Sequence, residues 1–257
     1  MNKTIVVIQA RNGSCRLPYK SVLSLNGTPV IGHIVNYILK NLTIPFPIVV
    51  ATSTRDEDQS ICDLLKSYPV QVFRGHPSDV LSRFSAISSI YNPFNIVRIT
   101  GDCPLVSAPV IEELVDVFNA NPSLDYASNT INRTFPHGFD VEIFRARLIL
   151  ESNLPLLSEV DREHVTPFMY KNIDSCLYNL ALESDFSNIR VTLDTGADYV
   201  FLDKLIRVWK DIHHDLSIPP VMTPGDIQSL INQNKILSKY HIAAKASALS
   251  HPIQLFN

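Results

Sequence analysis

Glycine and net charge are both scarce in this sequence. Only 8 of its 257 residues are glycine, whereas 17 are proline. So few glycines exclude collagen-like and glycine-rich repeats. The 22 Lys and Arg side chains nearly balance 25 Asp and Glu, for a net charge of −3 at pH 7, and a protein that holds nucleic acid by bulk positive charge is usually far more basic. We therefore expect no nucleic-acid partner, and any anionic ligand must be bound by a local cluster of cations.

The sequence also lacks closely spaced cysteines and long apolar runs. Its four cysteines, Cys15, Cys62, Cys103 and Cys176, include no Cys-x-x-Cys pair, so a thiolate zinc site is not expected and the thiols are interpreted as reduced. The apolar run at residues 5–8 is too short for a signal peptide, and no run approaches the roughly 18 residues that suggest a membrane span. These absences predict a cytoplasmic protein with no membrane partner.

What the sequence has instead is an alternation of apolar and amphipathic segments. Hydrophobic residues make up 46% of the chain, enough for a sizeable core. Near-continuous apolar runs such as TIVVIQA and IVVAT are typical of strands that are buried on both faces of a parallel sheet. We expect an α/β fold with a doubly wound, mostly parallel sheet. Strands are predicted at residues 4–10, 48–52, 70–73 and 96–100, and helices at residues 29–40, 57–66, 79–90 and 108–118.

The alternation changes after Pro122. The polar, turn-rich stretch DYASNTINRTFPHG predicts an insertion at about residues 125–175 rather than a second domain. Helices are expected to begin at Thr195, which forms a relative of the capping box with Asp198, and at Thr223. We expect one domain over residues 1–235 and a tail of ambiguous structure over residues 236–257. The remaining predicted elements are strands at 139–144, 176–182 and 189–193 and a helix at 146–153.

The loop after the first predicted strand carries three cations in ten residues: Arg11, Arg16 and Lys20. Ligands of open α/β sheets bind beyond the carboxyl ends of the strands, where this loop is expected to lie. It has neither a Gly-x-Gly-x-x-Gly fingerprint nor a Walker loop, so a dinucleotide site and a P-loop hydrolase are not supported. Backbone N–H groups around Gly13 can form an anion-binding nest beside the cations, which predicts a polyphosphate ligand. The alternative is a solvated basic loop.

The residues of this loop resemble a known signature. The stretch VIQARNGSCRLPYKSVLSLNGTPVI is similar to the N-terminal motif of the sugar cytidylyltransferases, A-R-x-x-S-x-R-L-P-x-K followed by N-G-x-P. Similarity is strongest to the spore-coat polysaccharide cytidylyltransferase-like proteins, which are related to the synthetases of CMP-activated ulosonic acids and acylneuraminates. It continues in FRGHPSDVLSRF, RITGDCPL, DYASNT, FPHGFDVEIF, DREHVTPFMY and VTLDTGADY, and so covers roughly residues 3–210.

Two positions depart from that signature. Cys15 stands where the family usually has Thr, and Tyr19 where it usually has Gly. We expect Tyr19 to narrow a triphosphate pocket. The resemblance also implies a Rossmann-like nucleotide-diphospho-sugar transferase fold, with an inserted segment for sugar binding and dimerisation.

Two aspartates follow predicted strands. Asp102 comes directly after Gly101, and Asp194 ends the stretch VTLD before another glycine turn. Each alone is explained as well by a helix cap. Beside a cationic loop, however, they predict an Mg²⁺ site, because Mg²⁺ takes one or two carboxylates together with phosphate oxygens and water. The resemblance implies that they are the metal-binding pair.

Further nucleotide contacts are predicted at other strand ends. The resemblance places Arg74, Asp79 and Arg83 near the base and ribose, although Asp79 is explained equally well as a helix cap. Backbone groups near Ala10 and Thr52 are expected to face a pyrimidine. The predicted catalytic residues are Arg11, Arg16, Lys20 and Asp102. The full predicted nucleotide set is Ala10, Arg11, Asn12, Gly13, Ser14, Arg16, Lys20, Thr52, Arg74, Asp79, Arg83 and Gly101.

The insertion is expected to bind the sugar. Asp140 and Glu142 alternate in phase on one face of a predicted strand, as two acceptors of sugar hydroxyls. Arg162 is expected to bind a sugar carboxylate from a loop that precedes a helix at Thr166-Pro167. His137 and His164 have a structural alternative, as hydrogen-bonded core histidines. The predicted sugar set is Asn129, His137, Gly138, Asp140, Glu142, Arg162, Glu163 and His164.

Together, the resemblance implies transfer of a cytidylyl group from CTP to an acidic sugar for surface polysaccharide synthesis, with Mg²⁺, by a homodimer. A glycosyltransferase that uses a nucleotide-sugar donor and a non-catalytic nucleotide-sugar-binding protein remain alternatives, because fold does not fix function. The three cations of the loop favour a triphosphate over the diphosphate of a sugar donor.

Overall fold

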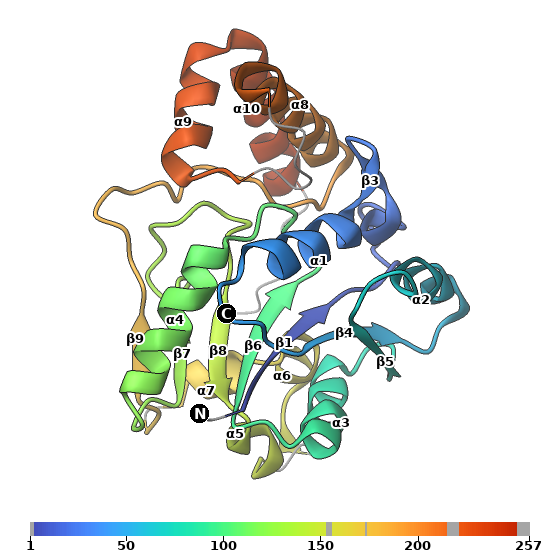
Figure 1. Ribbon diagram of the computed structural model, residues 1–257, viewed down its shortest axis with the longest axis vertical. Helices are drawn as coiled ribbons and strands as arrows, with labels where there is room; N and C mark the ends of the chain where they lie inside the picture. The colour runs from blue at the N-terminus through green and yellow to red at the C-terminus, as the bar shows by residue number, and fades with distance from the viewer. Residues whose placement is uncertain (1–2, 153–155, 173, 215–220, 251–257) are drawn as a thin grey trace.

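A twisted sheet with helices on both faces forms the centre of the structure (Figure 1). The computed structural model describes residues 3–152, 156–172, 174–214 and 221–250. Within these residues the central sheet has seven strands, in the order β5-β4-β1-β6-β8-β7-β9. Its strands are β1 (Thr4–Gln9), β4 (Ile48–Ser53), β5 (Gln71–Gly75), β6 (Asn95–Thr100), β7 (Tyr126–Ser128), β8 (Glu142–Arg145) and β9 (Leu177–Asn179).

The first four strands of this order are parallel, as expected. Strand β8 runs antiparallel to both β6 and β7, and β9 is parallel to β7. The prediction of a doubly wound, mostly parallel sheet is therefore confirmed, and the antiparallel β8 lies within the insertion predicted at about residues 125–175. A small second sheet pairs β2 (Ser24–Leu25) with β3 (Thr28–Pro29).

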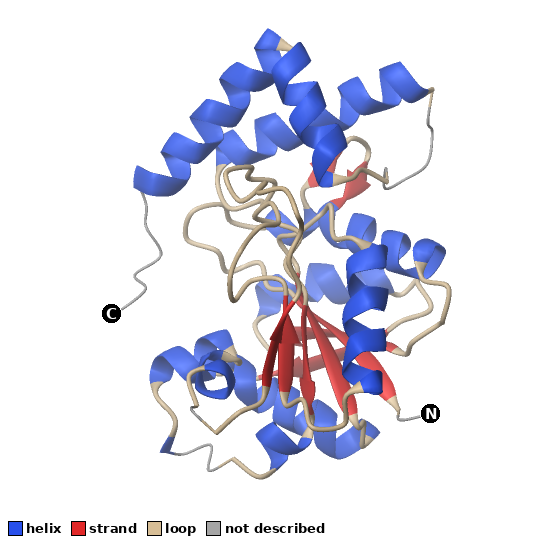
Figure 2. Ribbon diagram, turned by 90° about the vertical axis from the view of Figure 1, so that its left-hand side faces the viewer, coloured by secondary structure: helices blue, strands red, loops and turns tan. Residues whose placement is uncertain are grey.

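Helices cover both faces of the sheet and form an additional layer at one end (Figure 2). The helices are η1 (Lys20–Val22), α1 (Val30–Asn41), η2 (Asp56–Asp58), α2 (Gln59–Leu65), α3 (Val80–Tyr91), α4 (Ala108–Ala120), α5 (Arg147–Leu150), α6 (Glu159–His164), α7 (Pro167–Tyr170), α8 (Gly196–His213), α9 (Pro224–Gln233) and α10 (Lys235–Ser250). Among them, none has both the length and the hydrophobicity that a membrane span requires.

Strand β1 shows why the sheet needs two helical layers. Its residues alternate between the two faces, with Val6 and Ile8 packed on the side of α1 and α4, and Ile5 and Val7 packed on the side of α3 and α5. All four side chains are fully buried. A strand that is apolar on both faces is stable only when both faces are covered.

The predicted elements of the first half are confirmed to within a few residues, whereas several elements of the second half need correction. Residues 189–193 form no regular strand; His137 and Arg190 make an isolated bridge there instead. The predicted strand at 139–144 shortens to β8, which begins at Glu142. The predicted helix at 146–153 shortens to α5, which covers Arg147–Leu150. Residue 153, the last one of the predicted helix, lies outside the described part of the chain.

Helix α10 occupies most of the tail. It packs against α8 and α9, and buries Leu237 and Ala244 in the same hydrophobic core as the sheet. The helix starts at Thr195 and Thr223 are confirmed, each with a complete capping box to Asp198 and Asp226. The division of the chain at residue 235 stays a prediction, and residues 251–257 lie outside the described part.

Replacing Gly138 by alanine is expected to destabilise the fold. Gly138 has a φ of +108°, and a Cβ there would lie 2.7 Å from the carbonyl carbon of Val191. Strain and overlap together should lower the free energy of unfolding by about 3 kcal/mol. Thermal or denaturant unfolding of the purified variant measures the change.

Gly196→Ala is the matched control. A Cβ at Gly196 meets no atom within 4 Å, and the residue lies at the start of α8. Its stability should stay within about 0.5 kcal/mol of the unmodified protein. Equal stability of the two variants would contradict the close approach at Gly138.

Candidate active site

A cavity of about 510 Å³ opens beyond the carboxyl ends of β1 and β6. It lies where open α/β sheets bind ligands. Most of the predicted site residues line it together, although they come from segments far apart in the sequence. These are Ala10, Arg11, Gly13, Ser14, Arg16, Lys20, Arg83, Gly101, Asp102, His137, Asp140, Glu163, His164 and Asp194.

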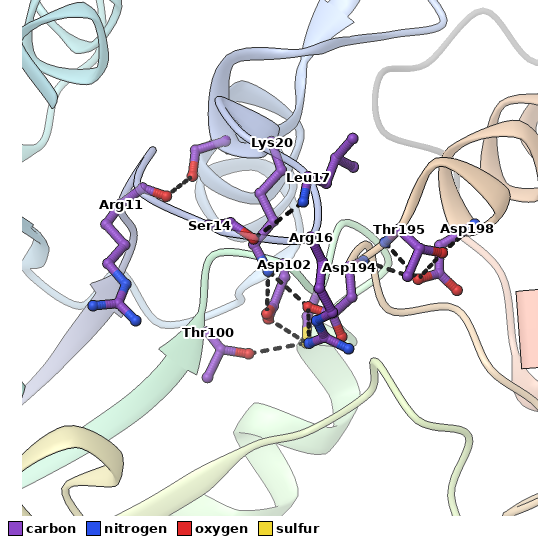
Figure 3. Close-up of polar contacts among 12 residues, drawn as sticks. Arg11, Ser14, Arg16, Leu17, Lys20, Thr100, Asp102, Asp194, Thr195 and Asp198 are labelled. Carbon is purple, nitrogen blue, oxygen red and sulfur yellow. Dashed lines mark hydrogen bonds and ion pairs between the residues drawn. The ribbon is translucent and has the colours of Figure 1, made fainter. Parts of the chain in front are cut away.

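The ammonium of Lys20 bridges Asp102 and Asp194 at the centre of this cavity (Figure 3). Its Nζ lies 2.8 Å from Asp102 Oδ2 and 2.8 Å from Asp194 Oδ1. Burial alone lowers the pKa of Lys20, but the two carboxylates outweigh burial and leave that pKa raised. Likewise, burial opposes ionisation of Asp102, yet Lys20 outweighs it and holds the pKa of Asp102 well below its usual range. Lys20 and Asp102 are therefore both charged at neutral pH.

Two arginines also converge on Asp194. Arg16 Nη2 lies 3.1 Å from Asp194 Oδ1, and Arg190 Nη2 lies 2.8 Å from Asp194 Oδ2. Arg190 Nε also donates to Asp198, at 2.9 Å. Arg190 is not among the residues predicted from the sequence, although a cation in phase with Asp194 along residues 190–194 was a usable signal.

The donor set of Asp102 and Asp194 fits a divalent cation. One ammonium nitrogen contacts an oxygen of each carboxylate, so a cationic group already occupies the space between them. Among the described residues, no group of three or more His, Cys, Asp or Glu side chains could hold a metal ion. Mg²⁺ commonly takes one or two carboxylates and fills its other positions with phosphate oxygens and water, so two carboxylates are a sufficient donor set.

The loop that carries the cations is tied down by Asn12. Its backbone N–H donates to Asp58 Oδ1 at 2.6 Å, and its side-chain amide donates to the carbonyl of Glu57 at 2.7 Å and to Ser60 Oγ at 2.9 Å. Asn12 is 1% exposed and does not line the cavity. The predicted nucleotide contact is therefore corrected: the side chain of Asn12 holds the loop against η2 and α2.

Of the predicted base and ribose contacts, only Arg83 lines the cavity through its side chain. Its buried guanidinium donates to the carbonyls of His76 and Pro77, at 2.8 Å each. Burial, with a smaller contribution from the charge of Arg11, lowers the pKa of Arg83 to about 10. Arg83 thus lines the cavity while its side chain fixes the loop before α3.

The structure corrects three other predicted nucleotide contacts. Arg74 points away from the cavity and donates to Gln59 and to the carbonyls of Ser53 and Arg55. Thr52 is buried in β4 and is not part of the cavity wall. Asp79 caps α3 by accepting from the N–H of Ser82 at 3.0 Å, which is the alternative that the sequence left open.

The run Asp-Arg-Glu-His is helical, contrary to the prediction of a loop. Ser158 and Asp161 form a capping box, and α6 extends to His164. Glu163 and His164 line the cavity, and Glu163 pairs with Arg11 at 3.0 Å. Val165, which follows the last residue of α6, has a φ of +73°. This is a strained conformation for a β-branched residue. The sequence did not predict this helix, because its six residues are too few to show the spacing of apolar residues that is typical of a helix.

Arg162 does not reach the cavity. It pairs with Asp79 across α6 and α3 and is not part of the cavity wall. The predicted role in binding a sugar carboxylate is therefore corrected: the geometry makes Arg162 a contact between two helices.

Asp140 and Glu142 do not share a strand face. Asp140 precedes β8, lines the cavity and pairs with Arg133, whose two terminal nitrogens lie 2.6 and 2.9 Å from its oxygens. Glu142 is buried behind the cavity wall and accepts from the hydroxyls of Tyr126 at 2.7 Å and Thr166 at 2.6 Å. The prediction that both carboxylates accept sugar hydroxyls is wrong for Glu142.

Two further predicted sugar contacts have structural roles. Asn129 is fully buried, where its side chain donates to the carbonyl of Phe139 at 2.8 Å and accepts from the N–H of Val141 at 3.0 Å. Gly138 packs against the backbone of Val191 and does not line the cavity.

Arg98 is the second residue that the sequence analysis missed. It lies in β6, lines the cavity and pairs with Glu142, while its Nε donates to Gln9 Oε1 at 3.0 Å. A charged residue among the apolar residues of NIVRIT was the signal that could have indicated it, because an arginine is rarely buried unless it is paired.

Comparison with known proteins assigns the chain to a family. A family model described as cytidylyltransferase matches residues 5–206. The chain belongs to this family. An uncharacterized protein of Methanocaldococcus jannaschii is 34% identical over 83% of this chain and 87% of its own length. The spore coat polysaccharide biosynthesis protein SpsF of Bacillus subtilis is 27% identical over 91% of this chain and 96% of its own.

Solved structures support the same assignment. A cytidylyltransferase from Leptospira borgpetersenii superposes with a TM-score of 0.82 and 30% identity, over 92% of this chain and 97% of that one. A CMP:2-keto-3-deoxy-manno-octonic acid synthetase in complex with CTP shares the fold, with a TM-score of 0.62 and 17% identity over 80% of this chain and 99% of that one. The protein is accordingly a nucleotidyltransferase with a Rossmann-like fold of the nucleotide-sugar transferase type.

The backbone explains one departure from the family signature. Tyr19 has a φ of +58°, the left-handed conformation that glycine adopts without strain. Its side chain is 49% exposed and is not part of the cavity wall. The expectation that Tyr19 narrows the triphosphate pocket is therefore wrong, and the usual glycine there fits the turn. Cys15 does line the cavity.

Removal of the Lys20 charge is expected to strengthen metal binding. In the absence of nucleotide, Lys20 neutralises both carboxylates, so Lys20→Met should raise the affinity for Mn²⁺ by about tenfold or more. Electron paramagnetic resonance of free Mn²⁺ measures the affinity. Lys66→Met, which removes an exposed cation far from Asp102 and Asp194, is the control, and equal affinities of the two variants would contradict the bridging role.

Proposed function

We propose that the protein transfers a cytidylyl group from CTP to a hydroxyl of an acidic sugar and releases pyrophosphate. The CMP-sugar product would serve the synthesis of a surface polysaccharide. The observation that carries this proposal is the convergence of Arg11, Arg16 and Lys20 on one cavity with Asp102 and Asp194. Mg²⁺ as the metal, a cytoplasmic location and a homodimer are further parts of the proposal.

The reaction is an in-line displacement. The acceptor hydroxyl oxygen forms a bond to the α-phosphorus of CTP, and the bond from this phosphorus to the β-phosphate oxygen breaks. Pyrophosphate leaves with the electron pair of that bond, and the hydroxyl proton passes to solvent. We assign no separate general base. Because the substrate and the leaving group are both highly anionic, most of the rate enhancement must come from fixed positive charge.

The cations of the cavity supply this charge. Lys20 remains protonated at neutral pH because its pKa is raised, and Arg11 and Arg16 add two guanidinium groups beside it. All three would bind the triphosphate and then the departing pyrophosphate. Asp102 and Asp194 would hold Mg²⁺, which when bound neutralises phosphate charge and lowers the pKa of the attacking hydroxyl.

Arg98 supports an acidic acceptor. It is 8% exposed, yet it lines the cavity. Its Nε donates to Gln9 and its Nη1 to Glu142, whereas no hydrogen bond within the described residues involves its Nη2. The two N–H groups of Nη2 are thus available to an acceptor in the cavity, and a sugar carboxylate is an acceptor that suits a guanidinium. We therefore assign to Arg98 the contact with a sugar carboxylate that the sequence predicted for Arg162.

Release of pyrophosphate tests the proposed function. Purified protein is incubated with CTP, ATP, GTP or UTP, with Mg²⁺ and with a panel of acidic and neutral sugars. We expect release with CTP and an acidic sugar, and little with either alone. Consumption of a nucleotide-sugar in place of CTP would identify a glycosyltransferase, and no release under any combination would indicate a non-catalytic binding protein.

Asp102→Asn should lower turnover by a factor of about 100 or more, as loss of a group that stabilises charge typically does. The measurement is kcat for pyrophosphate release at saturating Mg²⁺. Asp116→Asn, in α4, is the control and should keep normal turnover, because Asp116 is not part of the cavity wall. Near-normal turnover of Asp102→Asn would refute the metal role.

Arg98→Lys should weaken binding of the acidic sugar while it preserves the charge beside Glu142. A lysine lacks the guanidinium fork, so KM for the sugar should rise by about tenfold, with KM for CTP little changed. Arg162→Lys is the matched control and should leave both values near normal. If KM for the sugar rose in Arg162→Lys and not in Arg98→Lys, Arg162 would be the residue that binds the sugar carboxylate.

A further inference from the structure

The segment that carries Asp194 lies outside the sheet. Residues 189–194 are held along one side by the backbone of His137, which donates to the carbonyl of Ile189 at 2.9 Å and accepts from the N–H of Val191 at 2.7 Å. Farther on, the N–H of Leu193 donates to the carbonyl of Asp102 at 2.8 Å. Within the described part of the chain, these contacts stand in place of the ladder of hydrogen bonds that a central strand would have on this side.

The other side of this segment is held by the C-terminal helix α10. The backbone N–H of Arg190 donates to Nε2 of His241 at 3.2 Å. His241 is 8% exposed, and its ring lies against Phe201 of α8, with 5.2 Å between the ring centroids. Burial, together with the charge of Lys245, lowers the pKa of His241 to about 4. The imidazole is therefore neutral at physiological pH, with its proton on Nδ1 and the lone pair of Nε2 directed at Arg190.

Arg190 connects this contact to the centre of the cavity. Its guanidinium pairs with both Asp194 and Asp198. Asp198 in turn accepts from the N–H of Asp194 at 3.0 Å and closes the capping box of α8 with Thr195. Fixing the backbone at Arg190 therefore fixes the direction from which the Asp194 carboxylate enters the cavity.

We propose that His241 is a positioning residue of the active site, and that α10 holds Asp194 in place through the Arg190 backbone. This helix begins at Lys235, beyond residue 206 where the family match ends. The inference rests on the proposed function in one respect, that Asp194 is a metal ligand. Partners behind a metal ligand commonly change metal affinity when they are replaced, even though they touch neither metal nor substrate.

Two substitutions separate positioning from simple packing. His241→Phe keeps a ring of similar size against Phe201 but removes the acceptor. His241→Gln keeps an acceptor at a similar distance along the side chain. Ile242→Ala is the control, because Ile242 follows His241 on the same helix and is 64% exposed.

The first measurement is hydrogen exchange of the amides of residues 189–194, followed by mass spectrometry or NMR. In His241→Phe the amide of Arg190 should exchange about tenfold faster, because it loses its only acceptor. His241→Gln should restore most of the protection, and Ile242→Ala should exchange as the unmodified protein does. Unchanged exchange in His241→Phe would overturn the inference.

The second measurement is the affinity for Mn²⁺ alone, by electron paramagnetic resonance. His241→Phe should bind Mn²⁺ about tenfold more weakly, within the range seen for partners of metal ligands, and His241→Gln should recover. Faster exchange with unchanged Mn²⁺ affinity would limit His241 to a structural role and refute positioning. Neither measurement uses CTP or a sugar, so failure here is distinct from failure of the proposed function, which is an absence of pyrophosphate release.

If His241→Phe does not fold, the contact is tested in the unmodified protein. A scalar coupling through the hydrogen bond, between the Arg190 amide nitrogen and His241 Nε2, is expected in an NMR spectrum of deuterated, ¹⁵N-labelled protein at neutral pH. Absence of that coupling when both signals are resolved would overturn the inference.

Discussion

One buried ammonium between two carboxylates sets the arrangement of this active site. Asp102 and Asp194 repel one another, and bringing both into a largely desolvated cavity is costly unless a cation lies between them. Lys20 provides that cation from the loop after β1, while the carboxylates come from the end of β6 and from the segment before α8. The contact therefore joins three parts of the chain that the sheet alone would leave apart.

Other charges of the cavity follow the same rule. Arg11 faces Glu163, Arg98 faces Glu142, and Arg190 faces Asp194 and Asp198. The largely buried pairs of Arg98 and Arg190 add little stability, because each charge gives up its water to form them, and the exposed Arg11–Glu163 pair adds little because water screens it. Their value lies in holding the cations in fixed positions before an anionic substrate arrives, which is how preorganised electrostatics lowers a barrier. The near-neutral net charge of the chain thus hides a cavity dense in charge of both signs.

The sequence predicted the parallel half of the fold well, because buried strands such as β1 carry an unmistakable apolar run. It also predicted that the cationic loop lies beside Asp102 and Asp194, because polar residues beyond parallel strands meet at one edge of the sheet. It predicted the insertion poorly. Asn129 and Glu142 are polar residues whose partners are backbone groups or distant hydroxyls, and local sequence does not reveal such partners. Arg162 and Glu163 are adjacent in the sequence. Because they lie on a helix, their side chains point in different directions, so that Arg162 pairs with Asp79 whereas Glu163 pairs with Arg11 at the cavity.

The buried carboxylate of Glu142 limits which residues can replace its neighbours. Its carboxylate joins Arg98 of β6, Tyr126 of β7 and Thr166 before α7, so it ties the parallel and antiparallel halves of the sheet to one point. Substitution of Arg98 by a neutral residue would leave that carboxylate buried without a counter-charge, a defect that typically costs about 3–5 kcal/mol. Loss of the charge at residue 98 alone is therefore costly, and residues 98 and 142 are expected to change together.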